Sequence, residues 1–409
     1  MLLLIPPTPL SLLCAILLCL PLAVFFTFTT TTTTTTYPLP ITANITKTNP
    51  NQELLPPPPP PPPPPLKTNY NLLQDHQPKI NQTTNTSTTR ITVPVEDEED
   101  ISLFKLASRV DQNPTPTRKL AFLFLTTSPL PFAPLWDLYF PRAATNLYNI
   151  YIHAHPTLNH TTSFKGVFAN RLIPSKPTRR HSPTLISAAR RLLAHALLHD
   201  NSNSMFALLS PSCIPIHSFN YTFNTLINSN KSFIEILQDE PGAYDRWAAR
   251  GEHAMLPEVE FEDFRIGSQF WVVKRKHARI IVSDRSIWSK FKLPCLRDDT
   301  CYPEEHYFPT LMNMVDLGEC VPCTLTHVSW KGSRGGHPRM YKASDVGPEL
   351  IRTLRMDNPR YGGEELDGSK NSSLSRRRRR SDPFLFARKF SAGSVQQLMR
   401  IANDVLFKD

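Results

Sequence analysis

From about residue 118 onward the chain alternates short apolar runs with helical patterns, and this alternation limits the fold more than any other feature. "KLAFLFLTT" (119–127) and "LYNIYIHAH" (147–155) are rich in β-branched and aromatic residues. Such continuous apolar runs are typical of strands that are covered on both faces. The stretch "SPTLISAARRLLAHALLHD" has apolar residues at helical spacing, with Ser182 as the expected N-cap and Pro183 at the first helical position.

The later part of this region repeats the pattern. "MFALLSPSCIP" predicts another strand, and "SQFWVVKRKHARIIVSD" predicts a strand that turns into a helix. The chain ends with "FLFARKF" and a helix that Ser394 and Gln397 open at the spacing of a capping box. We therefore expect an α/β domain at 118–409, with one large core and a mostly parallel central sheet.

The N-terminal segment, residues 1–28, carries no charged side chain, and residues 10–28 are about long enough to cross a bilayer as a helix. We favour an uncleaved signal anchor, because no small-residue cleavage site is obvious after the apolar run. A cleaved signal peptide is the alternative, since the segment starts the chain and contains four prolines. The positive-inside rule gives no orientation, because the first Lys or Arg is Lys47.

Residues 29–117 have the composition of a disordered Thr/Pro-rich stem. They contain a threonine run at 29–36 and ten consecutive prolines at 56–65. Polyproline is extended and semi-rigid, so this segment is expected to hold the folded part away from the membrane. A proline-rich ligand for a cytosolic recognition domain is the alternative. The acidic cluster "EDEED" at 96–100 is predicted to be a solvated boundary before the fold begins.

Two features favour a secretory compartment over a nuclear or cytosolic one. Seven N-x-S/T triplets without an intervening proline begin at Asn44, Asn81, Asn85, Asn159, Asn220, Asn230 and Asn371. The run Arg376–Arg380 gives much of the net charge of +10, yet it lies in a serine-bordered stretch without interleaved aromatic residues. We therefore interpret this run as an exposed loop, with a nuclear-localisation signal as the second choice, and expect no nucleic-acid partner.

The five cysteines beyond the N-terminal segment are Cys213, Cys295, Cys301, Cys320 and Cys323. In a secretory chain structural disulfides are expected, which leaves one thiol free because the number is odd. The pairing cannot be deduced from sequence. A zinc site at "CVPC" is the less favoured alternative, because no second CxxC or matching His pair accompanies it.

Several common catalytic motifs are absent. The sequence contains no GxxxxGK[ST], GxGxxG or GxSxG motif, and no D-x-D pair of the kind that holds a metal in many sugar-nucleotide enzymes. If a nucleotide sugar binds, fixed cations must neutralise its diphosphate. Arg388 and Lys389, just before the last helix, are candidates for this role.

A set of motifs gives the chain a specific resemblance. "FLTTSPLPFAPLWDLYF", "YNIYIHAHP", "RRLLAHALLHD", "FALLSPSCIPI", "GSQFWVVKRKHARIIVSD", "EEHYFPT", "VSWKGSRGGHP" and "LFARKF" occur in order from about residue 119 to the C-terminus. In these the chain resembles plant members of the core-2/I-branching β-1,6-N-acetylglucosaminyltransferase family. The resemblance implies a single-pass type II Golgi membrane protein whose lumenal domain has a GT-A-like fold. It also implies an inverting acetylglucosaminyltransferase that uses a UDP-sugar and requires no metal.

The resemblance also implies roles for the segment "CYPEEHYFPT". The second member of its acidic pair, Glu305, would be the general base that takes the proton from the acceptor hydroxyl. Glu304 would orient or tune this base, and His306 would be a structural residue or a neighbour of the site. Lys389, with Arg388 beside it, would bind the UDP diphosphate. Without the resemblance, both glutamates would be taken for solvated loop residues.

Other candidate substrate-binding residues are supported more weakly. Trp330 could stack on a sugar face, although a large aromatic is more often part of the core. Gly267 and Ser268 could permit a close substrate approach or form a simple turn. His153 and His155 follow a strand, where nucleotides bind in α/β folds, but packed histidines are equally expected there. Where relatives carry acidic residues in the helix before "RRLLA", this chain has Ser187, Ala188 and Ala189.

Two functions follow from the sequence. The first is a metal-independent inverting glycosyltransferase that transfers N-acetylglucosamine from a UDP-sugar to a glycan or glycoprotein, with xylose or glucuronic acid as open alternatives. The second is a catalytically silent relative that binds saccharide as a cell-wall-associated scaffold. Convergence of Glu305, Arg388 and Lys389 at one place would favour the first, because catalysis requires a base and cations around one anomeric carbon.

Overall fold

The computed structural model describes residues 97–157, 164–297, 299–333, 337–363 and 381–409. These residues belong to one compact unit, residues 85–409. The predicted anchor and most of the predicted stem, like the run Arg376–Arg380, lie outside the described residues. Among the helices that are described, none combines the length and the apolar character needed to cross a membrane.

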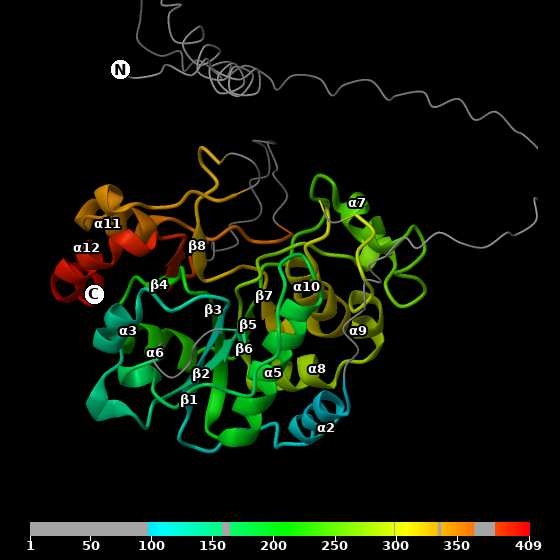
Figure 1. Ribbon diagram of the computed structural model, residues 1–409, viewed down its shortest axis with the longest axis horizontal. Helices are drawn as coiled ribbons and strands as arrows, with labels where there is room; N and C mark the ends of the chain where they lie inside the picture. The colour runs from blue at the N-terminus through cyan, green and yellow to red at the C-terminus, as the bar shows by residue number, and fades with distance from the viewer. Residues whose placement is uncertain (1–96, 158–163, 298, 334–336, 364–380) are drawn as a thin grey trace, which may run out of the picture. The chain divides into compact units, whose positions relative to one another are not determined.

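Within the described ranges, the centre of the domain is a six-stranded sheet with the strand order β2-β1-β3-β6-β5-β7 (Figure 1). Its strands are β1 (Lys119–Thr126), β2 (Tyr148–Ala154), β3 (Asn203–Leu209), β5 (Ser232–Phe233), β6 (Val272–Lys274) and β7 (Cys320–Val321). Parallel pairing joins β1 to β2 and β3, and β5 to β7, while β6 is antiparallel to both of its neighbours. The prediction of an α/β domain with a mostly parallel sheet is confirmed.

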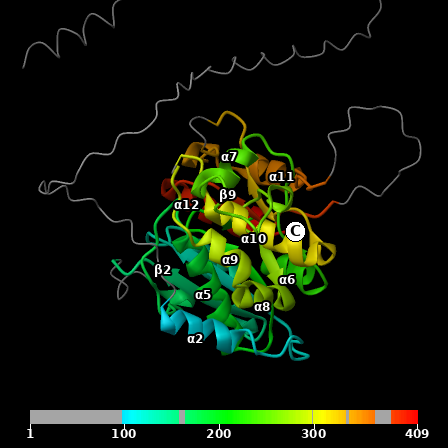
Figure 2. The same cartoon turned by 90° about the vertical axis from the view of Figure 1, so that its right-hand side faces the viewer.

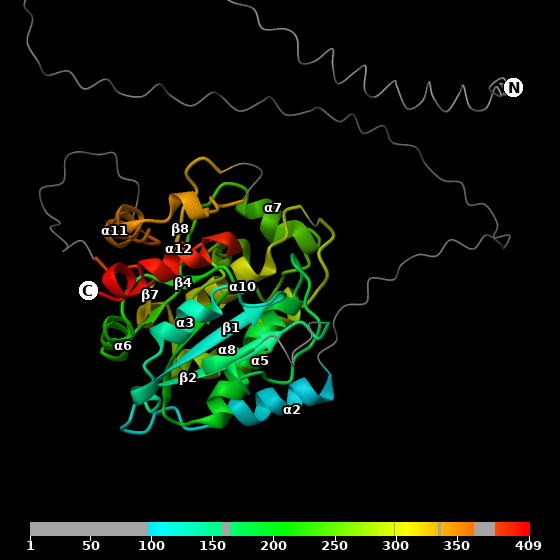
Figure 3. The same ribbon diagram turned by 60° about the vertical axis from the view of Figure 1, so that its left-hand side comes forward.

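Side chains of the central strands alternate between two hydrophobic clusters, because successive residues of a strand point to opposite faces. On β1, Phe122 and Phe124 belong to one cluster, and Ala121 and Leu123 belong to the other. The first cluster includes residues of α3 (Ala133–Tyr139), α6 (Phe219–Ile227), α11 (Pro348–Met356) and α12 (Val395–Arg400). The second includes residues of α2 (Glu98–Ala107), α5 (Thr184–His199), α8 (Arg275–Ser283), α9 (Ser286–Phe291) and α10 (Pro303–Asp316) (Figures 2 and 3). The sheet is therefore covered on both faces, as its apolar strands predict.

A second sheet holds the C-terminal segment beside the central one. It has the order β4-β9-β8 and consists of β4 (Ile214–Pro215), β8 (Thr326–Val328) and β9 (Phe386–Arg388). Strand β9 is antiparallel to β4 and parallel to β8, so Arg388 pairs with Val328. This sheet carries the two basic residues near the end of the chain to the middle of the domain.

The remaining helical elements are short. They are α7 (Ala243–Trp247), 3₁₀ turns at Arg142–Ala144, Gly166–Phe168, Ala248–Arg250, Phe261–Asp263, Leu317–Glu319, Ala343–Asp345 and Ala392–Ser394, and a π-helical turn at Ala402–Leu406. The predicted capping box at the last helix does not form. Ser394 is buried in helical conformation, and its hydroxyl donates to the carbonyl of Ser391 at 2.5 Å.

The acidic cluster before the first strand is part of the fold, so the prediction of a solvated boundary was wrong. Asp97 caps helix α2, which packs against α5 and α8. Asp100 is 5% exposed and forms ion pairs with Arg191 and, at 2.8 Å, with Lys176. A buried carboxylate requires such cations. The ordered fold thus includes residues ahead of the predicted start at 118.

The cysteines pair less than the sequence suggested. Cys295 and Cys301 form a disulfide, whereas Cys213 and Cys320 are both buried free thiols. The expectation of a single free thiol was therefore wrong. The disulfide closes a short loop directly before α10, and thus holds the segment that leads to Glu304 and Glu305.

Candidate active site

Glu305 lies in the first turn of α10, where the helix dipole favours acidic residues. Its neighbour Glu304 is 6% exposed, whereas the side chain of Glu305 is 39% exposed. Consecutive residues of a helix point in directions about 100° apart. Glu304 consequently packs inward while Glu305 remains accessible to another molecule.

The surroundings of Glu305 have two opposing effects on the pKa of its carboxyl group. Desolvation by the neighbouring protein raises the pKa of Glu305, and the guanidinium groups of Arg246 and Arg388 oppose this rise. Arg246 Nη1 lies 3.8 Å from Glu305 Oε2. The result is a partly exposed carboxylate, raised in pKa and flanked by two cations, which suits a general base.

Arg246 is positioned by two residues next to Glu305 in sequence. Its guanidinium donates to Nε2 of His306 at 3.4 Å and lies over the ring of Tyr302 at 5.3 Å. Burial, and then the cations Arg246 and Arg250, hold the pKa of His306 well below its usual range. His306 therefore contacts the guanidinium of Arg246 from the buried side of α10.

Arg388 ends strand β9, and its guanidinium lies over the ring of Phe270 at 4.5 Å. Desolvation lowers the pKa of Arg388, and Glu305 is among the groups that oppose this change. Lys389 follows directly, and desolvation, Arg180 and Arg388 lower its pKa. The structure thus brings Arg388 within electrostatic range of Glu305, and Lys389 adjoins Arg388, although Glu305 and Arg388 are more than eighty residues apart in sequence.

Gly267 and Ser268 connect this group to the central sheet. A Cβ atom at Gly267 would lie 1.9 Å from the carbonyl oxygen of Glu235, so the close approach at this glycine is made by the protein's own backbone. Ser268 Oγ accepts from the N–H of Phe270 at 3.1 Å. This bond lies next to Phe270, whose ring lies beneath the Arg388 guanidinium.

Glu235 is a member of the group that the sequence analysis missed. Desolvation raises its pKa to about 7; Glu240 and Glu305 add to the rise, while Arg360 and the Ser268 N–H oppose it. The one signal in the sequence was a lone carboxylate within the apolar run "SFIEIL". Since Glu235 and Glu305 interact, this side chain is a second carboxylate at the same place.

Glu304 faces the interior, where it meets another buried charge. Burial raises the pKa of Glu304 to about 7, and Glu305 adds to this rise, whereas Arg180 and Arg250 oppose it. The Arg250 guanidinium is buried and lies over the ring of Phe291 at 4.9 Å. Glu304 is therefore buried near Arg250 instead of pointing outward with Glu305.

The remaining candidate residues are Trp330, which is exposed, and the two histidines at the end of β2. Trp330 follows β8 and is 58% exposed, so it is not a core residue and its ring is available for stacking. His153 is fully buried, and its Nε2 accepts the N–H of Lys176 at 3.2 Å. His155 Nδ1 lies 2.8 Å from the hydroxyl of Thr157. The two histidines are thus engaged by their own loops.

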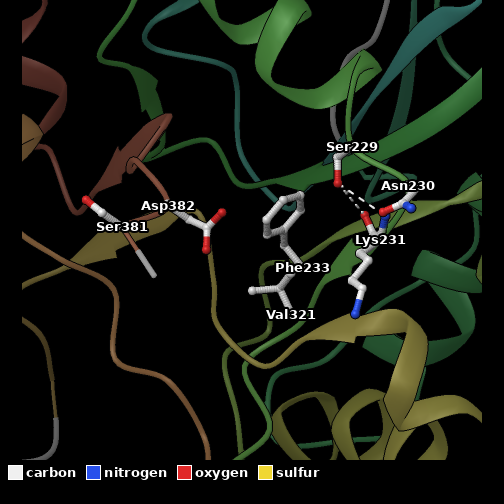
Figure 4. A pocket seen from close by; sticks show the side chains of 7 residues that line it. All are labelled: Ser229, Asn230, Lys231, Phe233, Val321, Ser381 and Asp382. Carbon is white, nitrogen blue, oxygen red and sulfur yellow. Dashed lines mark hydrogen bonds between the residues drawn. The ribbon is translucent and has the colours of Figure 1, made fainter. Parts of the chain in front are cut away.

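One pocket of about 240 Å³ lies elsewhere in the domain (Figure 4). It is lined by Ser229, Asn230, Lys231, Phe233, Val321, Ser381 and Asp382. Figure 4 shows Lys231 and Asp382 on opposite sides of Phe233 and Val321. Glu305 and the cations beside it are not part of this lining. Across the described ranges, no three His, Cys, Asp or Glu side chains gather as metal ligands, at "CVPC" or elsewhere.

Comparison with known proteins places this arrangement in a family. The family model described as "Core-2/I-Branching enzyme" matches residues 120–355. The chain is also 31% identical over 329 residues to the protein named "Glycosyltransferase BC10" from Oryza sativa subsp. japonica, and the aligned region covers 72% of this chain and 80% of that relative. The chain belongs to the core-2/I-branching enzyme family, as a plant-type member, and is a glycosyltransferase.

Proposed function

We propose that the protein is an inverting glycosyltransferase that uses a UDP-sugar and needs no metal ion. The observation that carries this proposal is the environment of Glu305, a partly exposed carboxylate with a raised pKa that lies 3.8 Å from Arg246 and interacts with Arg388. A direct displacement at an anomeric carbon requires a base for the acceptor hydroxyl and cations for the leaving group.

In the proposed reaction Glu305 takes the proton of an acceptor hydroxyl as its oxygen forms a bond to the anomeric carbon. The bond from that carbon to the donor phosphate breaks in the same step, and the electron pair leaves with UDP. Arg388 and Lys389 stabilise the charge that develops on the diphosphate. Attack from the face opposite the leaving group inverts the anomeric centre.

The finer assignments are part of the same proposal. We take N-acetylglucosamine as the transferred sugar and a glycan or glycoprotein as the acceptor, with Trp330 as a stacking surface for a sugar ring. We place the protein in the Golgi membrane as a single-pass type II protein anchored by residues 1–28. The sequon residues Asn220 and Asn230 are themselves exposed, and removal of N-linked glycans by peptide-N-glycosidase F is expected to increase the electrophoretic mobility of the protein.

The test is UDP release by the purified full-length protein, with a panel of UDP-sugars and simple acceptors, in excess EDTA. Turnover that persists in EDTA supports transfer with fixed cations in place of a metal. Turnover that requires added Mn²⁺ or Mg²⁺ would contradict the metal-independent mechanism. If UDP binds but no donor is turned over, the protein is instead a silent relative that binds saccharide.

A further inference from the structure

Arg180 lies in the loop between β2 and α5, within the basic triplet at 179–181. Residues 179–184, at the end of this loop, are folded into a compact turn by their own hydrogen bonds. The N–H of Arg179 donates to Thr184 Oγ1 at 2.8 Å, and the hydroxyl of Ser182 donates to the carbonyl of Arg179 at 2.8 Å. These bonds hold the triplet at the start of α5.

The same loop contacts the segment that carries the proposed base. The ring of His181 meets the ring of Tyr302 edge-on, with 4.8 Å between the ring centroids. Tyr302 is the residue directly before α10, and Arg246 lies over it at 5.3 Å. The residue next to Arg180 is therefore in contact with the start of the helix that presents Glu304 and Glu305.

The charge of Arg180 acts on both sides of the site. Desolvation is the main cause that lowers the pKa of Lys389 and Arg388, and Arg180 lowers both further; it also opposes the rise in the pKa of Glu304. The His181–Tyr302 contact places Arg180 beside the start of α10, and its charge is within electrostatic range of Arg388 and Lys389 at the end of β9.

These cations lack direct partners within the part of the chain that the structure describes. There, the side chains of Arg180, Arg388 and Lys389 form no hydrogen bond or ion pair, and Arg388 Nε is buried without an acceptor. Like charges repel one another, and more strongly where water is excluded. A bound polyanion relieves this repulsion and supplies the missing acceptors.

We propose that Arg180 is a third cation of the donor site and binds the diphosphate of the nucleotide together with Arg388 and Lys389. This inference rests on the proposed function for the identity of the ligand. The cluster itself fits any ligand with two linked phosphates, because such a group carries several negative charges and presents oxygens to more than one side. Arg180 also connects the bound diphosphate to the loop that contacts the start of α10.

The experiment is calorimetric titration of the purified full-length protein with UDP, uridine and inorganic pyrophosphate, each alone. Arg180→Ala is expected to weaken UDP and pyrophosphate binding about 10-fold, the usual effect of losing one charged hydrogen-bond donor, and to leave uridine binding unchanged. Arg180→Lys is expected to retain part of the affinity. Arg352→Ala is the matched control, since Arg352 is an exposed arginine paired with Glu349 on α11.

The outcomes separate this inference from the proposed function. Equal UDP binding by the wild type and Arg180→Ala would overturn the role of Arg180 and leave the proposed function standing. An equal loss of uridine affinity in Arg180→Ala would also overturn this role, because the loss of affinity would then reflect a disturbed fold and not a lost phosphate contact. If the wild type binds pyrophosphate through Arg180 but does not bind UDP, the cation cluster is supported and a UDP-sugar donor is ruled out. If the wild type binds neither ligand, the cation cluster and the proposed function are both rejected. Should Arg180→Ala not fold, Arg180→Gln and the salt dependence of wild-type binding give the same decision, since each cation contact weakens as salt rises.

Discussion

The backbone N–H of Gly267 donates to the carbonyl oxygen of Glu305 at 2.9 Å. This bond ties the turn before β6 to the first turn of α10. On its other side, Gly267 lies against the carbonyl of Glu235, with no space for a side chain. The central sheet, the second carboxylate and the proposed base are thus held together at one glycine.

Gly267→Ala is expected to destabilise the protein by about 3 kcal/mol or more, because its Cβ would lie 1.9 Å from a backbone oxygen that cannot move alone. Urea unfolding measures the change. Gly318→Ala is the matched control, since nothing lies within 4 Å of its Cβ position, and its effect is expected to stay within about 1 kcal/mol. An equal effect of both substitutions would contradict the close approach.

Arg246→Met is expected to shift the acid limb of the pH–rate profile to higher pH. The cation now favours the ionised form of Glu305, so its loss raises the pKa of that carboxyl further. A base must be ionised to act, and activity is lost as the pH falls through its pKa. The shift is expected to be about half a unit, because the partly exposed pair is screened by water. The profile of kcat/KM against pH measures it.

The control for this prediction is Arg246→Lys, which keeps the charge and is expected to keep the acid limb near its wild-type position. An acid limb that stays in place in Arg246→Met would show that Arg246 does not act on the group that titrates. A loss of activity without any shift would instead indicate a contact with the substrate.

Asp100→Ala is expected to destabilise the domain by about 3 to 5 kcal/mol, because it leaves the buried Arg191 without its carboxylate. Urea unfolding compares this variant with Glu98→Ala, which removes an exposed acid from the same helix and should change stability by less than about 0.5 kcal/mol. Equal stabilities would show that α2 contributes little to the fold. The predicted ranking also means that a fragment starting at residue 118 will be less stable than one starting before residue 97.

Local sequence patterns were sufficient to predict the long strands and the main helices. Strands β1 and β2 are continuous apolar runs, and a strand turns into helix α8 as predicted. Helix α5 begins at Thr184, so Pro183 takes the N-cap position that was predicted for Ser182. The role of Asp100 could not be found in this way, because its partner Arg191 lies 91 positions away and a charged residue in an acidic run resembles a solvated one. Burial of a charge depends on tertiary partners, which local patterns do not contain.

The residues of the candidate active site could be predicted only in part, because their contacts also depend on tertiary partners. The roles of Glu305, Arg388 and Lys389 were predicted from the resemblance to a known family. That Glu305 and Arg388 interact could be seen only in the folded structure. Glu235 comes from a short strand region and Arg246 from a five-residue helix, and neither has a local motif. Arg180 lay in a basic triplet that composition alone would assign to the surface.

The most direct test of the central claim is the turnover number of Glu305→Gln with a saturating UDP-sugar donor, measured beside Glu304→Gln and Glu235→Gln. Glutamine keeps the shape of the side chain but cannot accept the proton, so kcat is expected to fall at least about 100-fold, with UDP affinity within about twofold of wild type. Glu304→Gln is expected to retain most of the activity, because its carboxyl faces the interior. Wild-type turnover by Glu305→Gln, or a collapse in Glu235→Gln alone, would contradict the assignment of Glu305 as the base.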